Sequence, residues 1–217
     1  MNNEVKVWDI WLRLFHWLLV VLVVAQFVTG YVGENWLEWH TKCGFAVLGL
    51  LIFRIVWGVV GSYHARFANF LRGPGAVLAY LKGLPSGEVP RTLGHNPMGA
   101  LSVVVMLLSL LLQAVTGLFS NDDITTEGPY AGSVSKAASD FLTGVHKINA
   151  NVLIALAVLH LLAIGYYYFI KKDNLVKAML TGNKAYDGEA PAVARPMWLA
   201  PLIAVVVGVA VYWIVKK

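Results

Sequence analysis

The sequence has few cysteines and few charges. One cysteine in 217 residues, Cys43, excludes a disulfide framework, a thiolate metal cluster and covalent haem attachment through C-x-x-C-H. Charged residues make up 13% of the chain. That is about half the share of a soluble domain, which excludes disorder, nucleic-acid-binding tails and ordinary cytosolic enzymes. Hydrophobic residues make up 58%, and the mean hydropathy is +0.66. We therefore expect an integral membrane protein that does not bind nucleic acid.

Several segments are long and apolar enough to cross a bilayer core, which takes about 20 helical residues. They are Ile10–Tyr31, His40–Val60, Pro97–Phe119, Val145–Ile170 and Met197–Val215. The first segment is too long for a signal peptide and lacks a small-residue cleavage site, so we expect it to be retained. The sequence predicts an all-α membrane bundle with three parts. They are a four-helix domain (residues 1–170), a cytoplasmic linker (171–196) and a fifth C-terminal transmembrane helix (197–217).

The charges between these segments predict the orientation of the bundle. The loops after the second and fourth segments are basic, and those after the first and third are acidic. Basic loops stay on the cytoplasmic side of a bacterial inner membrane, so we expect a multi-pass protein with a cytoplasmic N-terminus. Lys216 and Lys217 are an exception to this rule, because a fifth membrane-spanning segment would leave these two basic residues on the outer side. Residues Gly75–Leu84 predict a short helix at the membrane surface.

Four of the six histidines lie within or at the edge of the apolar segments, where an ionisable side chain is costly and suggests function. His146 and His160 are fourteen residues apart, so they share a helix face and lie about 21 Å apart along the axis. By depth, His16 pairs with His160 on the inner side and His40 with His146 on the outer side. Such pairs on facing helices suit the axial ligation of two haem irons. Each histidine alone is equally well explained by a hydrogen bond to a neighbouring helix.

Other residues lie at the depths of these pairs. Gly30 and Gly117 lie at the level of the outer pair, each within a Gln-x-x-Thr-Gly sequence. They would let a flat macrocycle, or simply a neighbouring helix, approach the backbone. Arg54 lies at the level of the inner pair, where a haem propionate or the membrane interface would accommodate its charge. The absence of a nearby cysteine or carboxylate disfavours tetrahedral zinc at either pair.

A polar cluster precedes the third apolar segment. Asn96 and Pro97 suit the cap and the first turn of a helix, which leaves His95 unexplained. A histidine titrating near its ordinary pKa can move protons at a quinone headgroup. His95 and Asn96 are therefore a candidate quinone site, with loop capping as the alternative.

Several motifs occur together in residues 5–170. They are Val7-Trp8-Asp9, Arg13-Leu14-Phe15-His16-Trp17, His40, Arg54-x-x-Trp57-Gly58, His64-Ala65-Arg66-Phe67, Gly94-His95-Asn96-Pro97-Met98-Gly99, His146 and His160. The set resembles the bacterial cytochrome b family that includes the membrane cytochrome b subunit of nickel-iron hydrogenases. More distantly, it resembles the cytochrome subunit of formate dehydrogenase. The resemblance implies two b-type haems in a four-helix core. It also implies electron exchange between quinones and a periplasmic partner that is cytochrome c-like or hydrogenase-like. On this basis the haem ligands are His16, His40, His146 and His160.

Two other functions stay open. A stand-alone haem oxidoreductase would pass electrons from a small species such as superoxide to quinone without a stable partner. A helical transporter or assembly factor would use its histidines structurally and would be colourless when purified. The fifth segment has no histidine, and we expect it to dock a partner or a second copy of the chain. The acidic residues between Asp122 and Asp140 would steer a basic partner, although a loop that merely lacks positive charge is the simpler explanation.

Overall fold

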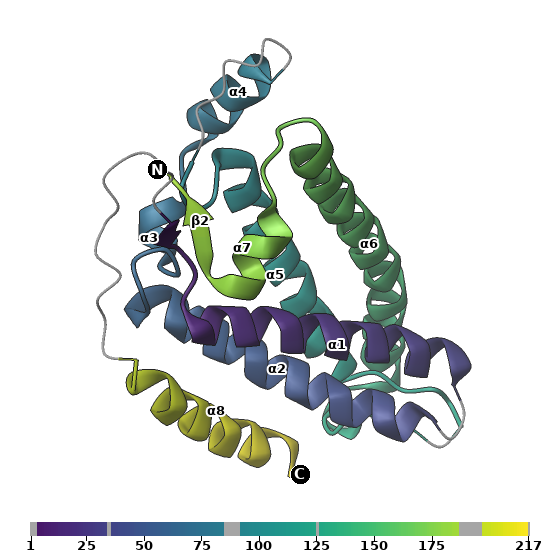
Figure 1. Ribbon diagram of the computed structural model, residues 1–217. Helices are drawn as coiled ribbons and strands as arrows, with labels where there is room; N and C mark the ends of the chain where they lie inside the picture. The colour runs from purple at the N-terminus through teal and green to yellow at the C-terminus, as the bar shows by residue number, and fades with distance from the viewer. Residues whose placement is uncertain (1–3, 34–35, 85–91, 125, 187–196, 217) are drawn as a thin grey trace.

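The computed structural model of the protein describes residues 4–33, 36–84, 92–124, 126–186 and 197–216 (Figure 1). Its architecture is the all-α membrane bundle that the sequence predicts. Four helices in this part of the chain are long and apolar enough to cross a membrane: α1 (Ile10–Val32), α2 (Leu37–Val60), α5 (Pro97–Gly117) and α6 (Lys136–Phe169). A shorter apolar helix, α8 (Leu199–Val215), packs against α2. The chain is therefore a multi-pass membrane protein.

The long helices form two hairpins, because α1 packs along α2 and α5 packs along α6 (Figure 1). Contacts between α2 and α5 join the hairpins. A buried apolar cluster lies at this junction and consists of Val47, Leu51, Leu110 and Leu153. Many other apolar side chains on these helices are exposed, as expected for surfaces that face lipid.

The two ends of the bundle carry different small elements. We call the end with the α1–α2 and α5–α6 connections the acidic end; it includes the short 3-10 helix η2 (Ala131–Ser133). The opposite end, the basic end, carries β1 (Glu4–Lys6), α3 (Phe67–Phe70), α4 (Pro74–Gly83), α7 (Leu175–Thr181) and β2 (Asn183–Ala185). Helix α4 confirms the short helix expected over Gly75–Leu84, displaced by one residue.

The start of the segment expected to be a linker folds back onto the bundle. Strand β2 pairs antiparallel with β1, and α7 lies beside the start of α1 (Figure 1). The Arg13 guanidinium donates to the carbonyl of Met179 at 3.3 Å and also to that of Leu180. Residues 187–196 lie outside the described part of the chain. Residues 171–186 thus pack as part of the basic end.

Asp9 ties the start of α1 to the end of α2. It is fully buried, and its Oδ1 caps α1 by accepting from the Leu12 amide at 2.9 Å. Its Oδ2 accepts from Trp57 Nε1 at 3.1 Å and from Ser62 Oγ at 2.5 Å. These bonds fix the height of α1 against α2, and therefore the depth of His16.

Helix α6 begins earlier than the apolar pattern predicts. The expected start was Val145, but the helix begins at Lys136, where Ser135 Oγ accepts from the Ala138 amide at 3.3 Å. Its first turns are polar, so hydropathy does not detect them. Its 34 residues span about 51 Å, more than a hydrocarbon core of about 30 Å. The polar turns therefore extend the acidic end beyond the hydrocarbon.

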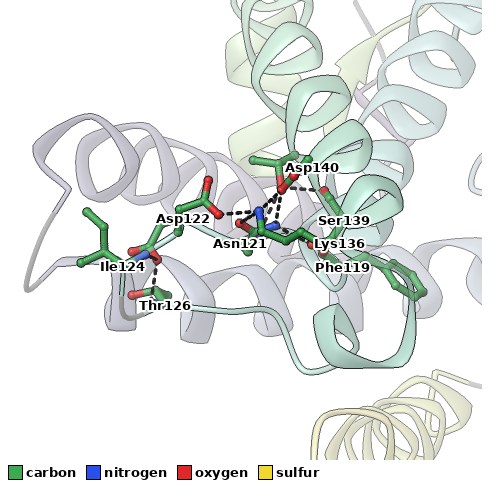
Figure 2. A network of polar contacts seen from close by, with 10 residues as sticks. Phe119, Asn121, Asp122, Ile124, Thr126, Lys136, Ser139 and Asp140 are labelled. Carbon is green, nitrogen blue, oxygen red and sulfur yellow. Dashed lines mark hydrogen bonds and ion pairs between the residues drawn. The ribbon is translucent and has the colours of Figure 1, made fainter.

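A polar network at the acidic end holds the α5–α6 connection against the start of α6 (Figure 2). Asn121 Nδ2 donates to Ser139 Oγ at 2.6 Å and to Asp140 Oδ1 at 3.1 Å. Ser139 Oγ in turn donates to the Phe119 carbonyl at 2.7 Å. These bonds set where α5 ends and α6 begins, and so the relative height of the two helices.

Candidate haem sites

The predicted outer pair, His40 on α2 and His146 on α6, comes together near the acidic end. Their ring centres are 6.1 Å apart, and the ring planes are inclined at 76°. An imidazole nitrogen lies about 2 Å from a bound metal ion, with the ring centre roughly 1 Å further. One metal ion between two imidazoles therefore separates their ring centres by about 6 Å. The observed separation fits a single iron held by both residues, which we call the acidic-end pair.

Both rings of the acidic-end pair are anchored in the same way through Nδ1. His40 Nδ1 lies 3.0 Å from the Gln26 carbonyl oxygen and 3.4 Å from Thr29 Oγ1, both on α1. His146 Nδ1 lies 3.0 Å from the Gln113 carbonyl oxygen and 3.2 Å from Thr116 Oγ1, both on α5. Donation from Nδ1 to a carbonyl selects the tautomer whose Nε2 lone pair is free to bind a metal.

The two glycines of the repeat make room for these rings. A Cβ at Gly30 would lie 3.1 Å from His40 Cε1, and a Cβ at Gly117 would lie 3.1 Å from His146 Cε1. At each glycine, the space where a side chain would project is therefore occupied by the ring of the proposed haem ligand. Both glycines and the repeat can be recognised in the sequence, but this contact cannot, because residue spacing does not reveal which ring a glycine faces.

Asn149 supports the anchor on the second hairpin. This buried side chain donates from Nδ2 to the Gln113 side-chain oxygen at 2.7 Å and to the Ser109 carbonyl at 2.9 Å. On the first hairpin, Gln26 Nε2 donates directly to the His40 carbonyl at 2.6 Å. Sequence reasoning missed Asn149, although an asparagine inside an apolar helix is itself a signal of interhelical bonding.

The predicted inner pair, His16 on α1 and His160 on α6, forms the basic-end pair. The two imidazoles are close enough to interact electrostatically. His16 Nδ1 is buried and has no hydrogen-bond partner among the described residues, and its ring packs edge-on against Trp17 at 5.0 Å. Within the described residues, His16 therefore lacks the backbone anchor that holds both rings of the acidic-end pair.

Arg54 on α2 is a buried cation. It is 2% exposed, its guanidinium lies 4.5 Å from the centre of the Phe67 ring, and Nη1 finds no hydrogen-bond partner in the described chain. Asp9 interacts with it electrostatically, but no described carboxylate lies within ion-pair distance of Arg54. A buried cation without a contacting anion is costly. A haem propionate fits this unpartnered donor.

His95, part of the candidate quinone site, is packed among rings at the basic end. Its ring centre lies 4.8 Å from that of Trp8 and 4.5 Å from that of Phe70, and Nδ1 has no described hydrogen-bond partner. Burial, with the Arg54 guanidinium and His64 adding to it, lowers the pKa of His95 to about 3. Burial also lowers the pKa of His64, whose Nε2 is likewise unpartnered. Both rings are therefore neutral at physiological pH, and burial keeps His95 from titrating near its ordinary pKa as the sequence led us to expect. The proximity of His64 and His95 could not be predicted from their spacing in the sequence.

Asn96, the other half of the candidate quinone site, caps α5. Its Oδ1 accepts from the Gly99 amide at 2.8 Å, which confirms the capping that the sequence predicts. Its Nδ2 donates to Tyr167 Oη at 2.7 Å, and Tyr167 Oη lies 2.5 Å from Tyr80 Oη. The side chain therefore joins the start of α5 to α6 and, through Tyr80, to α4.

The donor set fits a haem iron better than a bare metal ion. Across the described residues, no group of three or more His, Cys, Asp or Glu could hold a metal. Two imidazoles per site suffice when a macrocycle supplies the other ligands. A membrane-embedded helical bundle with paired histidines at two depths is the architecture of a b-type cytochrome.

The chain belongs to the prokaryotic cytochrome b561 family, whose model matches residues 7–182. It is 22% identical to the probable Ni/Fe-hydrogenase B-type cytochrome subunit of Azotobacter chroococcum mcd 1, covering 88% of this chain and 92% of that protein. It is 24% identical to cytochrome b561 homolog 2 of Escherichia coli strain K12, covering 80% of this chain and 90% of that protein. No solved structure matches the chain significantly. The protein is thus a bacterial cytochrome b of hydrogenase-like type, which binds b-type haem and transfers electrons within the membrane.

Proposed function

We propose that this protein carries electrons across the bacterial inner membrane through two b-type haems, between the quinone pool and a periplasmic redox partner. The observation that carries the proposal is the acidic-end pair, whose 6.1 Å ring separation suits one iron. The basic-end pair supplies a second site of the same type on the opposite side of the bundle. A bound haem iron exchanges one electron reversibly, which is the chemistry that electron transfer requires.

The protein residues have separate tasks in this proposal. His40 and His146 hold one haem, and His16 and His160 hold the other. Arg54, with its unpartnered Nη1, binds a propionate of the haem at the basic end. Gly30 and Gly117 leave room for the ligand rings at the acidic end. The apolar side chains around the pairs keep water away and so influence the potentials.

We place the quinone at the basic end, next to His95 and Asn96, and the basic end in the cytoplasm. Burial and the nearby guanidinium keep His95 neutral, so its ring can accept or donate a hydrogen bond at a quinone oxygen. Menadiol offers a test of this placement. Replacing His95 by Ala should slow haem reduction by menadiol about tenfold, as expected for the loss of one hydrogen bond worth about 1.4 kcal/mol, while haem content stays unchanged. An unchanged rate with both haems bound would argue for a quinone site elsewhere.

The periplasmic partner would dock at the acidic end. Lys136 pairs with Asp123 at 2.5 Å and also with Asp140, so part of the acidic charge of this loop is neutralised internally. The relative in Azotobacter chroococcum is named as a hydrogenase subunit, which supports a hydrogenase-like partner for this chain. A cytochrome c-like protein is the other partner that we expect from the sequence. Because part of the acidic charge is neutralised, charge alone does not select the partner. We expect the hydrogen-bonded residues drawn in Figure 2 to form part of the docking surface.

The experiment is a haem count on the purified protein by the pyridine haemochrome assay, repeated on single His→Ala variants of each pair. Wild type should hold two b-type haems per chain, and each variant should hold one. Asn151→Ala is the control, because this exposed side chain lies on α6 between the two histidines. A single haem in wild type would make one pair structural, and a colourless folded protein would refute the proposal.

A further inference from the structure

The two histidine pairs differ in how their Nδ1 atoms are held. Both members of the acidic-end pair lie 3.0 Å from a glutamine carbonyl on the neighbouring helix, and both have a threonine hydroxyl at 3.2–3.4 Å. The same three residue types at the same spacing, Gln-x-x-Thr-Gly, supply the anchor on α1 and on α5. At the basic end, His16 Nδ1 is buried and has no such partner among the described residues. The described part of the chain provides no hydrogen bond to the His160 ring either.

We propose that the two Gln-x-x-Thr-Gly segments form a matched clamp that positions His40 and His146 and gives the acidic-end haem a lower reduction potential than the basic-end haem. The proposal rests on the proposed function, because it requires a haem at each pair. Thr29, Thr116, Gly30 and Gly117 become positioning residues, since they act through the ligands.

The direction of the effect follows from the hydrogen bond. A ligand imidazole that donates its Nδ1 proton to a carbonyl is more basic, and it transfers more electron density to the iron. Electron-rich ligation stabilises the oxidised state, which lowers the potential. At the basic end the Nδ1 anchor is missing, and the buried Arg54 cation favours the reduced state of the haem nearest to it. Both differences act in the same direction.

Each threonine presents an acceptor to its histidine. Thr29 Oγ1 donates to the Ala25 carbonyl at 2.6 Å, and Thr116 Oγ1 donates to the Leu112 carbonyl at 2.7 Å. Because the hydroxyl proton is used in this way, an oxygen lone pair is left for the Nδ1 proton. Valine has the same shape but lacks the oxygen, whereas serine keeps it. The pair of substitutions therefore separates the hydrogen bond from the packing.

Each glycine sets the position of its ring. A Cβ added at Gly30 or Gly117 would approach the imidazole to 3.1 Å, closer than an ordinary contact, so the ring must shift. Gly144 is a matched control, because it lies on α6 near His146 and its Cβ would meet nothing within 4 Å. Gly144→Ala thus tests a glycine-to-alanine change in the same region without contact with a ligand.

The test is a spectroelectrochemical titration of the purified holoprotein, combined with electron paramagnetic resonance of the low-spin ferric haems. The His16→Ala variant retains the acidic-end haem alone and so identifies its signals. In wild type, this haem should have the lower potential. Thr29→Val and Thr116→Val should each raise that potential and leave the other haem unchanged, and Thr29→Ser and Thr116→Ser should restore it. Gly30→Ala and Gly117→Ala should alter its resonance signal, and Gly144→Ala should not.

The outcomes separate this inference from the proposed function. If a threonine-to-valine variant loses the acidic-end haem alone while its serine counterpart keeps it, the clamp is supported through haem content. If both haems stay bound and the valine variants leave both potentials unchanged, the clamp is overturned while the proposed function stands. The same holds if the acidic-end haem proves to have the higher potential. A protein without haem would refute both proposals.

Discussion

Single buried polar residues determine the relative heights of the helices in this bundle. Asp9 accepts three hydrogen bonds from α1, from Trp57 and from the loop after α2, all within an apolar surrounding. In a lipid-embedded protein the apolar surfaces alone specify little, because lipid is as apolar as another helix. Bonds of this kind therefore align the histidines at matching depths.

Replacing Asp9 by Ala should lower the stability of the protein. The change removes a helix cap worth about 1 kcal/mol. It also leaves the buried Trp57 N–H and Ser62 O–H without an acceptor, at about 1 kcal/mol or more each. We expect a total loss of about 3 kcal/mol, read as a lower thermal denaturation midpoint in detergent. The control is Glu4→Ala, which removes an exposed 3.4 Å ion pair with Lys177 and should change the midpoint little. Equal effects of the two substitutions would contradict the role of Asp9.

His95 should make the protein less stable in acid. Its pKa is about 3 in the folded state because of burial, Arg54 and His64, against an ordinary value of 6.5. The unfolded chain therefore takes up a proton first, and stability falls as the pH drops through the window from 6.5 towards 3. His95→Gln cannot be protonated there, so it should lose less stability than wild type between pH 7 and pH 5. The measurement is the thermal denaturation midpoint as a function of pH. If the midpoints of wild type and His95→Gln fall equally between pH 7 and pH 5, this explanation is contradicted.

At the scale of elements, the packing at the end of α2 depends on the aromatic ring of Phe67, which occupies the space next to Gly58 where a side chain would otherwise lie. A Cβ at Gly58 would lie 2.0 Å from Phe67 Cε2, so the Phe67 ring at the start of α3 sits where any other residue would project. The same ring lies under the Arg54 guanidinium. The position of α3 and the direction of Arg54 thus depend on one glycine.

Gly58→Ala should therefore be severely destabilising. The added methyl group must displace the Phe67 ring and with it the contact to Arg54. We expect a loss of about 1–3 kcal/mol or more from overpacking, together with weaker haem retention at the basic end. Gly165→Ala on α6 is the control, because its Cβ would meet nothing within 4 Å. Thermal denaturation and haem content measure the two effects, and a Gly58→Ala protein as stable as the control would show that this packing is adjustable.

Periodicity and hydropathy in the sequence predict the helices of this fold well, but they predict the contacts between the helices poorly. The apolar segments, the short helix α4 and the Asn96 cap follow from local patterns, and the structure confirms them. The early start of α6 does not follow, because its first turns are polar. The depth pairing predicts that His40 meets His146, but not that Thr29 and Thr116 contact them. That contact depends on how two hairpins pack, and sequence spacing carries no information on it.

As a whole, the molecule repeats one design in its two hairpins. Each hairpin supplies one histidine to the acidic end and one Gln-x-x-Thr-Gly segment that anchors it. The two hairpins differ at the basic end. Fourteen residues before the glycine of the repeat, α1 has His16 whereas α5 has Val103. Helix α8 packs against α2. It lies outside residues 7–182, the region that the family model matches. If each pair holds a haem, as proposed above, the two ends hold similar cofactors in different surroundings.

The central claim is that electrons cross the membrane through both histidine pairs in series. The direct measurement uses vesicles that contain the purified protein, with ferricyanide inside and dithionite outside. Wild type should bleach the trapped ferricyanide much faster than protein-free vesicles do. His40→Ala and His16→Ala should each reduce the rate to that of protein-free vesicles, because either haem is then missing from the series. Fast transfer by either variant, or none by wild type with both haems bound, would contradict the claim.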